Sequence, residues 1–145
     1  MKRRESRETA FRLLFALEFN ADDNAENVIE TAVNELSGIE EFENPDFTVD
    51  DYALALLNGT VEHKAELDEM ISKCLVNWRI ERIPITAKEI MRLALYEIKY
   101  QQVKPAIVIS EAIEIIKRYE DNSVVSFING ALGNAVKLIG KEEEK

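Results

Sequence analysis

Residues 103–119 read VKPAIVISEAIEIIKRY, and the conformation of this stretch decides the fold class of the chain. The consecutive β-branched residues at 107–109 are typical of a buried strand. The apolar pattern continues as far as Tyr119, however, and this is too long for a typical strand. Pro105 suits the first turn of a helix. The stretch therefore predicts a helix that begins near Pro105 and is buried on most sides.

The rest of the sequence also has helical apolar spacing, and it offers no alternating segment that could pair with a strand. Thr48 with Asp51, and Thr86 with Glu89, have the spacing of residues that cap helix starts. We predict an all-α fold of about seven helices, in a single helical domain over 1–140 that is followed by a charged tail over 141–145. The helices are expected at about 3–20, 25–37, 48–61, 67–78, 86–98, 105–119 and 122–139.

Two Asn-Gly pairs, Asn58-Gly59 and Asn129-Gly130, lie inside this helical periodicity, although the pair is typical of hairpin turns. A glycine inside a helix costs about 1 kcal/mol relative to alanine. Such a conflict between a local rule and a strong pattern often marks a demand of packing or of function. Two explanations stay open: a close approach of two helices where a Cβ would not fit, or a close approach of the backbone to a ligand.

The composition is that of a globular protein. Of the 145 residues, 46% are hydrophobic and 32% are charged, which excludes collagen-like and wholly disordered chains. No continuous apolar run approaches the roughly 18 residues of a membrane span, and no signal-peptide core follows the basic N-terminus. The single cysteine, Cys74, excludes an intramolecular disulfide. We therefore expect a cytoplasmic protein that has no membrane partner.

The net charge of −10 is unevenly distributed along the chain. Residues 1–12 carry five basic and two acidic residues, a net charge of +3. Between Arg12 and Lys64 there are thirteen acidic residues and no lysine or arginine. An acidic surface repels nucleic acid. The uneven distribution nevertheless leaves one small basic end in an otherwise negative sequence.

The basic end falls on the start of the first predicted helix, where cations oppose the helix macrodipole at a cost of about 0.3–1 kcal/mol each. Glu8 lies at i, i+4 spacing from two arginines and would form weak surface pairs with them. Those pairs do not explain Lys2, Arg3 and Arg7. A partner that carries phosphates would offset the unfavourable placement, and the planar guanidinium of arginine suits phosphate. Nucleic-acid binding is therefore one hypothesis, and a set of surface ion pairs is the other.

Residue types that perform catalysis are sparse. The only histidine, His63, and the only cysteine, Cys74, stand eleven positions apart, and no cluster has metal-ligand spacing. The sequence has no phosphate-cradling glycine-rich loop. We expect His63 on the surface near a helix end, and Cys74 in the core on an apolar stripe with Met70 and Trp78. The sequence therefore predicts a chain that is not an enzyme and that has no metal and no cofactor.

Five segments of the chain have a specific order and spacing. They are RRESRETA at 3–10, LLNGTV at 56–61, IMRLALYEI at 90–98, ISEAIEIIK at 109–117 and FINGAL at 127–132. Each segment is weak evidence by itself. Together they make the chain resemble the NusB family of bacterial transcription antitermination factors, across nearly its whole length.

The resemblance implies an all-helical fold of two three-helix subdomains plus one further helix, and no catalytic activity. It also implies binding to single-stranded RNA, at the boxA element of ribosomal RNA leaders, as a heterodimer with the ribosomal protein NusE. That complex helps RNA polymerase to read through premature termination. The family includes monomers and homodimers, so a homodimer of this chain is one expectation. NusB-like domains also occur fused to RNA methyltransferases, but the sequence has no glycine-rich cofactor-binding segment.

Carried over by position, the family's sites fall on two sets of residues. Glu5 interrupts the basic run, which would weaken or re-aim the phosphate contacts, and Phe15 stands where the family often has tyrosine, so that stacking remains. For Arg92, the alternative to partner binding is a partly buried ion pair with a neighbouring acid. For the whole chain, the alternative function is a helical protein-interaction adaptor without direct RNA binding. The RNA-binding set is Lys2, Arg3, Arg4, Arg7, Phe15, Phe127, Asn129 and Gly130, and the partner-binding set is Glu81, Arg82, Glu89 and Arg92.

Overall fold

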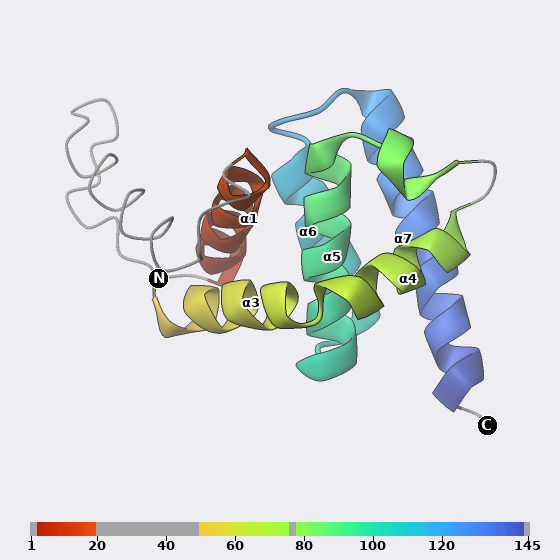
Figure 1. The fold of residues 1–145 in the computed structure, drawn as a ribbon, viewed down its shortest axis with the longest axis horizontal. Helices are drawn as coiled ribbons and strands as arrows, with labels where there is room; N and C mark the ends of the chain where they lie inside the picture. Colours follow the sequence, from red (N-terminus) through yellow and green to blue (C-terminus); the bar gives the residue numbers. More distant parts are fainter. Residues whose placement is uncertain (1–2, 20–49, 76–77, 144–145) are drawn as a thin grey trace. The chain divides into compact units, whose positions relative to one another are not determined.

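The computed structural model describes residues 3–19, 50–75 and 78–143. Within these ranges the chain forms six α-helices and a short 3-10 helix, with no strand, which confirms the predicted all-α fold (Figure 1). The helix predicted over 25–37 lies outside the described residues. The helices are α1 (Arg3–Phe19), α3 (Asp51–Glu62), α4 (Lys64–Cys74), η1 (Ile80–Arg82), α5 (Ile85–Tyr100), α6 (Pro105–Ile116) and α7 (Asn122–Glu143).

The chain divides into two compact units, Met1–Asn58 and Gly59–Lys145. The first unit contains α1 and most of α3, and the second contains the end of α3 and the helices from α4 to α7. In α1, Phe11 and Leu14 are buried at helical spacing, so the apolar stripe predicted from the sequence is the buried face of the helix.

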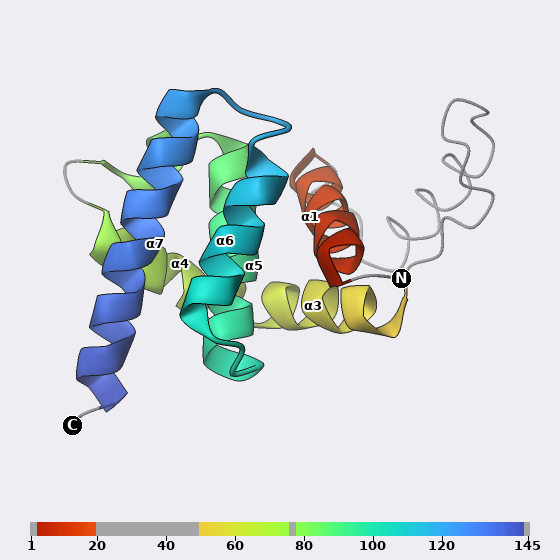
Figure 2. The same ribbon diagram turned by 180° about the vertical axis from the view of Figure 1, so that it is seen from behind.

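Helix α5 is the core helix of the second unit. It contacts α4, α6 and α7, and every residue from Glu89 to Ile98 is buried. Figure 2 shows α6 and α7 side by side with α5, and these two helices also contact each other. Leu95 of α5, Ile116 of α6 and Leu132 of α7 are each fully buried. The unit is therefore held together by apolar side chains from several helices packed around α5.

The stretch that decides the fold class is helical, as predicted, and Pro105 occupies its first turn. Two details differ from the prediction. Helix α6 ends at Ile116, so Tyr119 lies beyond it. It is also not buried on most sides, because Ile107 is 48% exposed and only one face of the helix is in the core. The buried residues of α6 are Val108, Ala112, Ile115 and Ile116.

Of the two predicted helix caps, the one that the structure describes does not form. Helix α3 begins at Asp51, and the Asp50 carboxylate accepts a hydrogen bond from the Ala53 N–H at 2.8 Å. The cap predicted at Thr48 lies outside the described residues. Helix α5 begins at Ile85 after Pro84, which has no side-chain capping bond. Thr86 lies inside the first turn of α5, where its hydroxyl donates to Glu120 at 2.6 Å. The capping box predicted for Thr86 is therefore wrong.

The two Asn-Gly pairs have different surroundings. A Cβ at Gly59 would lie 2.0 Å from Cζ of Tyr96, which confirms a close approach of α3 and α5 at this position. A Cβ at Gly130 would have no heavy atom outside its own helix turn within 4 Å. Packing thus explains Gly59, whereas no packing contact among the described residues explains Gly130.

We expect Gly59→Ala to lower the free energy of unfolding by about 1–3 kcal/mol, because the buried ring of Tyr96 must move to admit the methyl group. Urea unfolding measures the change. Gly133→Ala in α7 is the matched control, since its Cβ meets nothing within 4 Å and alanine is the better helix former. Equal stability of Gly59→Ala and the parent chain would contradict the close packing.

Helix α7 is longer than predicted, because it extends to Glu143 and so includes the first residues of the expected tail. Its residues 122–140 have the length and the mean hydropathy, 1.2, of a helix that could cross a membrane, by length and composition only. Packing accounts for part of this apolar character, since 22% of the apolar window is buried. Helix α7 contacts α4, α5 and α6, and Ile128 and Leu132 are fully buried.

Candidate nucleic-acid interface

The first turn of α1 presents two arginines. Arg3 and Arg4 are both exposed, together with Glu5, which interrupts the basic run as expected. The guanidinium carbon of Arg3 lies 3.7 Å from the centre of the Tyr52 ring, a cation–π contact. Tyr52 belongs to the first turn of α3. A helix start that would be stabilised by acids therefore carries exposed cations instead.

A second contact joins the starts of α1 and α3. The Ser6 hydroxyl donates to the Asp50 carboxylate at 2.6 Å, and Ser6 is fully buried. Burial acts to raise the pKa of the Asp50 carboxyl. The hydrogen bonds from Ser6 and Ala53 and the charge of Arg3 outweigh that effect, so the pKa lies below its usual value. Asp50 therefore stays ionised near neutral pH and helps to hold the first turn of α1 in place.

The remaining basic residues of α1 differ in exposure. Arg7 is only 7% exposed, so a phosphate could reach it only after its side chain moved outward. Arg12 is exposed and pairs with Glu8 at 3.7 Å, which confirms one of the expected surface pairs. Lys2 lies outside the described residues. Of the predicted phosphate ligands that the structure describes, Arg3 and Arg4 are thus the ones on the surface.

The other predicted RNA-facing residues are divided between the two units. Phe15 is half-buried on α1. Phe127 is half-buried on α7, while Asn129 and Gly130 follow on the same helix and are both exposed. Because Phe127 and Gly130 are three residues apart in a helix, they lie on neighbouring parts of its surface. The structure therefore brings the α7 residues together, and it places Phe15 in the other unit.

The position of Trp78 differs from the one that the sequence predicts. It was expected on the buried stripe of a helix over 67–78, but α4 ends at Cys74 and Trp78 is 57% exposed. Its ring meets the ring of Phe127 edge-on, with 6.0 Å between centroids and an interplanar angle of 66°. The adjacent Arg79 is also exposed. An aromatic residue directly followed by an arginine was the signal that could have marked this position.

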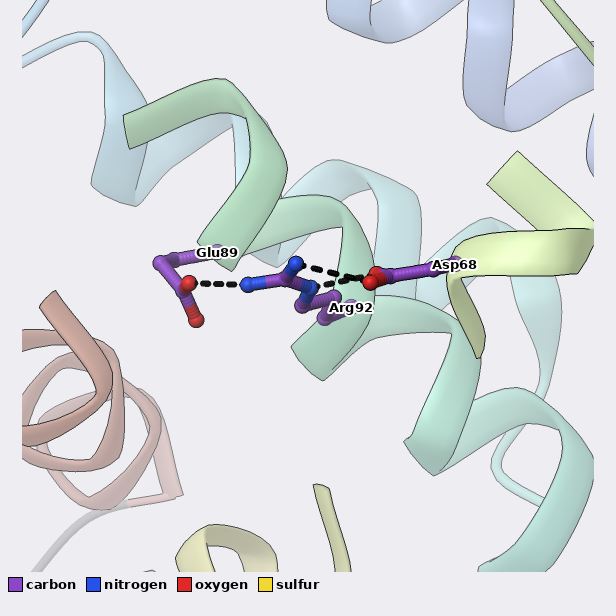
Figure 3. A network of polar contacts seen from close by, with 3 residues as sticks. All are labelled: Asp68, Glu89 and Arg92. Carbon is purple, nitrogen blue, oxygen red and sulfur yellow. Dashed lines mark hydrogen bonds and ion pairs between the residues drawn. The ribbon is translucent and has the colours of Figure 1, made fainter. Parts of the chain in front are cut away.

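The predicted partner-binding residues have two different environments. Glu81 and Arg82 are exposed on η1. Glu89 and Arg92 of α5 are buried, with 2% and 5% exposed, and belong to the network drawn in Figure 3. A protein partner would therefore meet Glu81 and Arg82 directly, and would reach the other two only after they were uncovered.

The guanidinium of Arg92 bridges two carboxylates. Its Nε donates to Oδ1 of Asp68 at 2.5 Å and its Nη2 to Oδ2 at 2.9 Å, a bidentate pair that joins α5 to α4 (Figure 3). Its Nη1 donates to Oε1 of Glu89. These contacts match the alternative given for Arg92, an ion pair with a neighbouring acid, and they assign the residue a structural role inside the second unit.

The only histidine and the only cysteine of the chain both make contacts within the fold. Cys74 is 3% exposed, its thiol donates to the Ile71 carbonyl at 3.1 Å, and burial raises the pKa of the thiol. This confirms the predicted core position of Cys74. His63 stands at the start of α4 and stacks on Tyr100, with 4.1 Å between ring centroids. Among the described residues no group of His, Cys, Asp and Glu could hold a metal ion.

Tyr100 also takes part in a polar cluster at the end of α5. Its hydroxyl donates to Glu66, and this bond raises the pKa of Tyr100 to about 12. Glu66 also accepts a hydrogen bond from Lys99 at 2.5 Å, and these two donors lower the pKa of its carboxyl. The cluster therefore joins the start of α4 to the end of α5.

The described residues thus form an all-helical fold with an exposed pair of arginines, Arg3 and Arg4, at the start of α1. A sequence model of the NusB family matches residues 4–137. The transcription antitermination protein NusB of Bacillus subtilis (strain 168) is 42% identical over 135 residues, which are 92% of this chain and 94% of that protein. The chain therefore belongs to the NusB family.

Solved structures agree with this assignment. A crystal form of T. maritima NusB superposes with a TM-score of 0.77 at 30% identity, and the match covers 94% of this chain and 92% of that one. A crystal structure of the antitermination factors NusB and NusE in complex with dsRNA has a TM-score of 0.76 at 26% identity, and the match covers 95% and 99% of the two chains.

Proposed function

We propose that this NusB-family antitermination factor binds the boxA element of nascent ribosomal RNA together with NusE, and so promotes read-through by RNA polymerase in the cytoplasm. The observation that carries the proposal is the exposed pair Arg3 and Arg4 at the start of α1. Stability alone would favour acids at this position. A ligand that carries phosphates would be attracted both by these two guanidinium groups and by the helix N-terminus. The related NusB described in complex with NusE and dsRNA supports both partners.

The RNA is proposed to be single-stranded where it contacts α7. Phe127 offers an aromatic surface for an unpaired base, and Asn129 offers amide groups for hydrogen bonds to base edges. The acidic remainder of the chain disfavours loose contact with other nucleic acid, since the net charge is −10. The same negative charge attracts a basic ribosomal protein, for which the exposed Glu81 is the proposed docking residue.

Binding of fluorescently labelled boxA RNA and of a scrambled RNA of equal length, with and without NusE, tests this function. We expect tighter binding of boxA than of scrambled RNA when NusE is present. A duplex form of the same RNA measures the strand requirement. If NusE binds the chain but the complex binds neither RNA, the chain is instead a protein-interaction adaptor. The same titration followed by light scattering shows whether the binding species is a monomer or a homodimer.

Gly130 provides a separate test of the α7 contact. We expect Gly130→Ala to raise the free energy of unfolding by up to about 1 kcal/mol, because the new methyl group meets open space within a helix. We also expect it to weaken RNA binding several-fold, because the methyl group would hold the RNA away from the backbone. RNA titration and urea unfolding measure the two effects.

Gly133→Ala is the matched control, since its Cβ also meets open space one helical turn further along α7. It should stabilise the chain to a similar extent and leave the RNA affinity unchanged. Equal RNA affinity of the Gly130→Ala and Gly133→Ala variants would show that Gly130 does not contact the RNA.

A further inference from the structure

Trp78 is the single tryptophan of the chain and its most exposed large hydrophobic side chain among the described residues. It lies between the end of α4 and the start of η1, with 57% of its surface exposed. The edge-on contact with Phe127 leaves much of the indole open to solvent. Burial of so large an apolar ring would stabilise the fold, and the exposed indole does not contribute this energy. Its position therefore needs an explanation other than packing.

The indole borders a cavity of about 400 Å³. This volume lies within the range of about 300–1,000 Å³ that is usual for small-ligand sites. Among the residues that the structure describes, the lining is mainly apolar and contains no carboxylate. The residues that define this Trp78 groove are Trp78, Arg82, Ile83, Pro84, Val124 and Phe127, and Ser123 adds a hydroxyl.

Two guanidinium groups border the groove. Arg82 lines it, and Arg79 follows Trp78 and lines a second hollow of about 610 Å³ that shares Trp78 and Arg82. Both arginines are exposed, and neither forms an ion pair with another residue in the described part of the chain. Glu81 lines the second hollow only. In a chain of net charge −10, an apolar groove with two such arginines is suited to an anionic ligand that also carries a flat ring.

The groove is continuous with the proposed RNA contact on α7. Phe127 belongs to the groove, and Gly130 lies one helical turn further along the same helix. An RNA strand on Asn129 and Gly130 would therefore pass the Trp78 indole within a short distance along α7. This continuity favours a nucleobase over a segment of another protein as the occupant.

We propose that the Trp78 groove binds one unpaired nucleobase of RNA, which stacks on the indole while Arg79 and Arg82 contact the flanking phosphates. The proposal rests on the RNA-binding function proposed above and extends the interface beyond the residues of α1 and α7. Stacking is insensitive to base identity, because every base has a π-face. The groove thus adds affinity for single strands, and it adds little sequence specificity.

The single tryptophan makes the test direct, because all tryptophan emission of the chain comes from Trp78. Labelled single-stranded boxA RNA is titrated into the chain with NusE, and binding is followed by anisotropy of the RNA label. Tryptophan emission is recorded in the same titration after subtraction of the emission of NusE. We expect quenching that saturates together with the anisotropy. A duplex of the same sequence should quench less at equal occupancy, because its bases are already stacked.

Substitutions of Trp78 measure how much the groove contributes to RNA affinity. We expect Trp78→Ala to weaken single-stranded RNA binding about 5- to 150-fold, which converts the 1–3 kcal/mol per stacked base found by alanine substitution. Trp78→Phe should retain most of the affinity, because a smaller ring still stacks. Ile107→Ala is the matched control, since it also removes an exposed apolar side chain, from α6, and should leave RNA affinity unchanged. Circular dichroism checks that each variant keeps its helices.

The outcomes separate this proposal from the proposed function. If RNA binds but Trp78 emission stays constant and Trp78→Ala binds as tightly as the parent, the groove is not an RNA site and the proposed function stands. If NusE alone quenches Trp78 and RNA adds no change, the groove is a protein contact and the proposal is overturned. If no RNA binds even with NusE, the proposed function fails and this proposal fails with it.

Discussion

A double variant, Arg3→Ala with Arg4→Ala, is expected to bind boxA RNA about 25-fold more weakly than the parent chain at 0.1 M salt. Each phosphate contact on a single strand changes the logarithm of affinity by about 0.7 for each tenfold change in salt. One contact is therefore worth about 5-fold at 0.1 M relative to 1 M, and two contacts are worth about 25-fold. Fluorescence anisotropy with NusE present measures the loss.

The double variant should remain as stable as the parent. Removing Arg3 gives up its contact with the Tyr52 ring, which is worth about 0.5–1 kcal/mol at an exposed site. Removing two cations from a helix start returns about 0.3–1 kcal/mol for each. Arg12→Ala is the matched control, because Arg12 is an exposed arginine of the same helix that pairs with Glu8. A loss of about 5-fold in the control, half that of the double variant on a logarithmic scale, would show that only overall charge matters.

The largest effect on stability is expected from Arg92→Met, which should lower the free energy of unfolding by about 3–5 kcal/mol. Methionine keeps most of the volume and the helix propensity but removes the donors that face Asp68 and Glu89. Glu89 is 2% exposed, so its carboxylate would stay buried without the guanidinium that now balances it. Urea unfolding at constant pH and salt measures the change.

A second substitution identifies the cause. Glu89→Gln in the Arg92→Met background should recover part of the lost stability, because it removes the buried charge. Lys117→Ala is the control, since it breaks the exposed Lys117–Glu114 pair and should cost no more than about 0.5 kcal/mol. A loss below 1 kcal/mol in Arg92→Met would mean that the network contributes little to the second unit.

The sequence was sufficient to predict the fold class because length and periodicity agree over long segments. The stretch that includes Pro105 has too many consecutive helical repeats for a strand, and it forms α6. Helix ends were less predictable. No glycine or proline stands between Cys74 and Pro84, so nothing local marks the end of α4, and Trp78 was assigned to its buried stripe.

Tertiary partners explain the other differences. The Thr86 hydroxyl bonds to Glu120, a residue 34 positions away, and a capping rule that considers four residues cannot include such a partner. The two Asn-Gly pairs look alike in the sequence, yet only Gly59 faces a neighbouring ring, that of Tyr96. What lies opposite a residue depends on packing between helices, which single-sequence periodicity does not describe.

The sequence likewise predicts only part of the candidate site. The basic run was visible as charge, but its division into exposed Arg3 and Arg4 and buried Arg7 depends on how α1 is packed. The spacing of Glu89 and Arg92, three residues apart in a helix, fitted a partner surface as well as it fitted an internal ion pair. Burial decides between these two environments, and it is a property of the folded chain.

The salt dependence of RNA binding tests the central claim most directly, because its slope counts the phosphates that the chain neutralises. Lys2, Arg3 and Arg4 would neutralise three, so they account for a slope of about −2 in a plot of log affinity against log salt. The Arg3→Ala, Arg4→Ala variant, measured in the same complex with NusE, should flatten the parent slope by about 1.4. Identical slopes for the parent and the variant would contradict the claim that the start of α1 holds the RNA backbone.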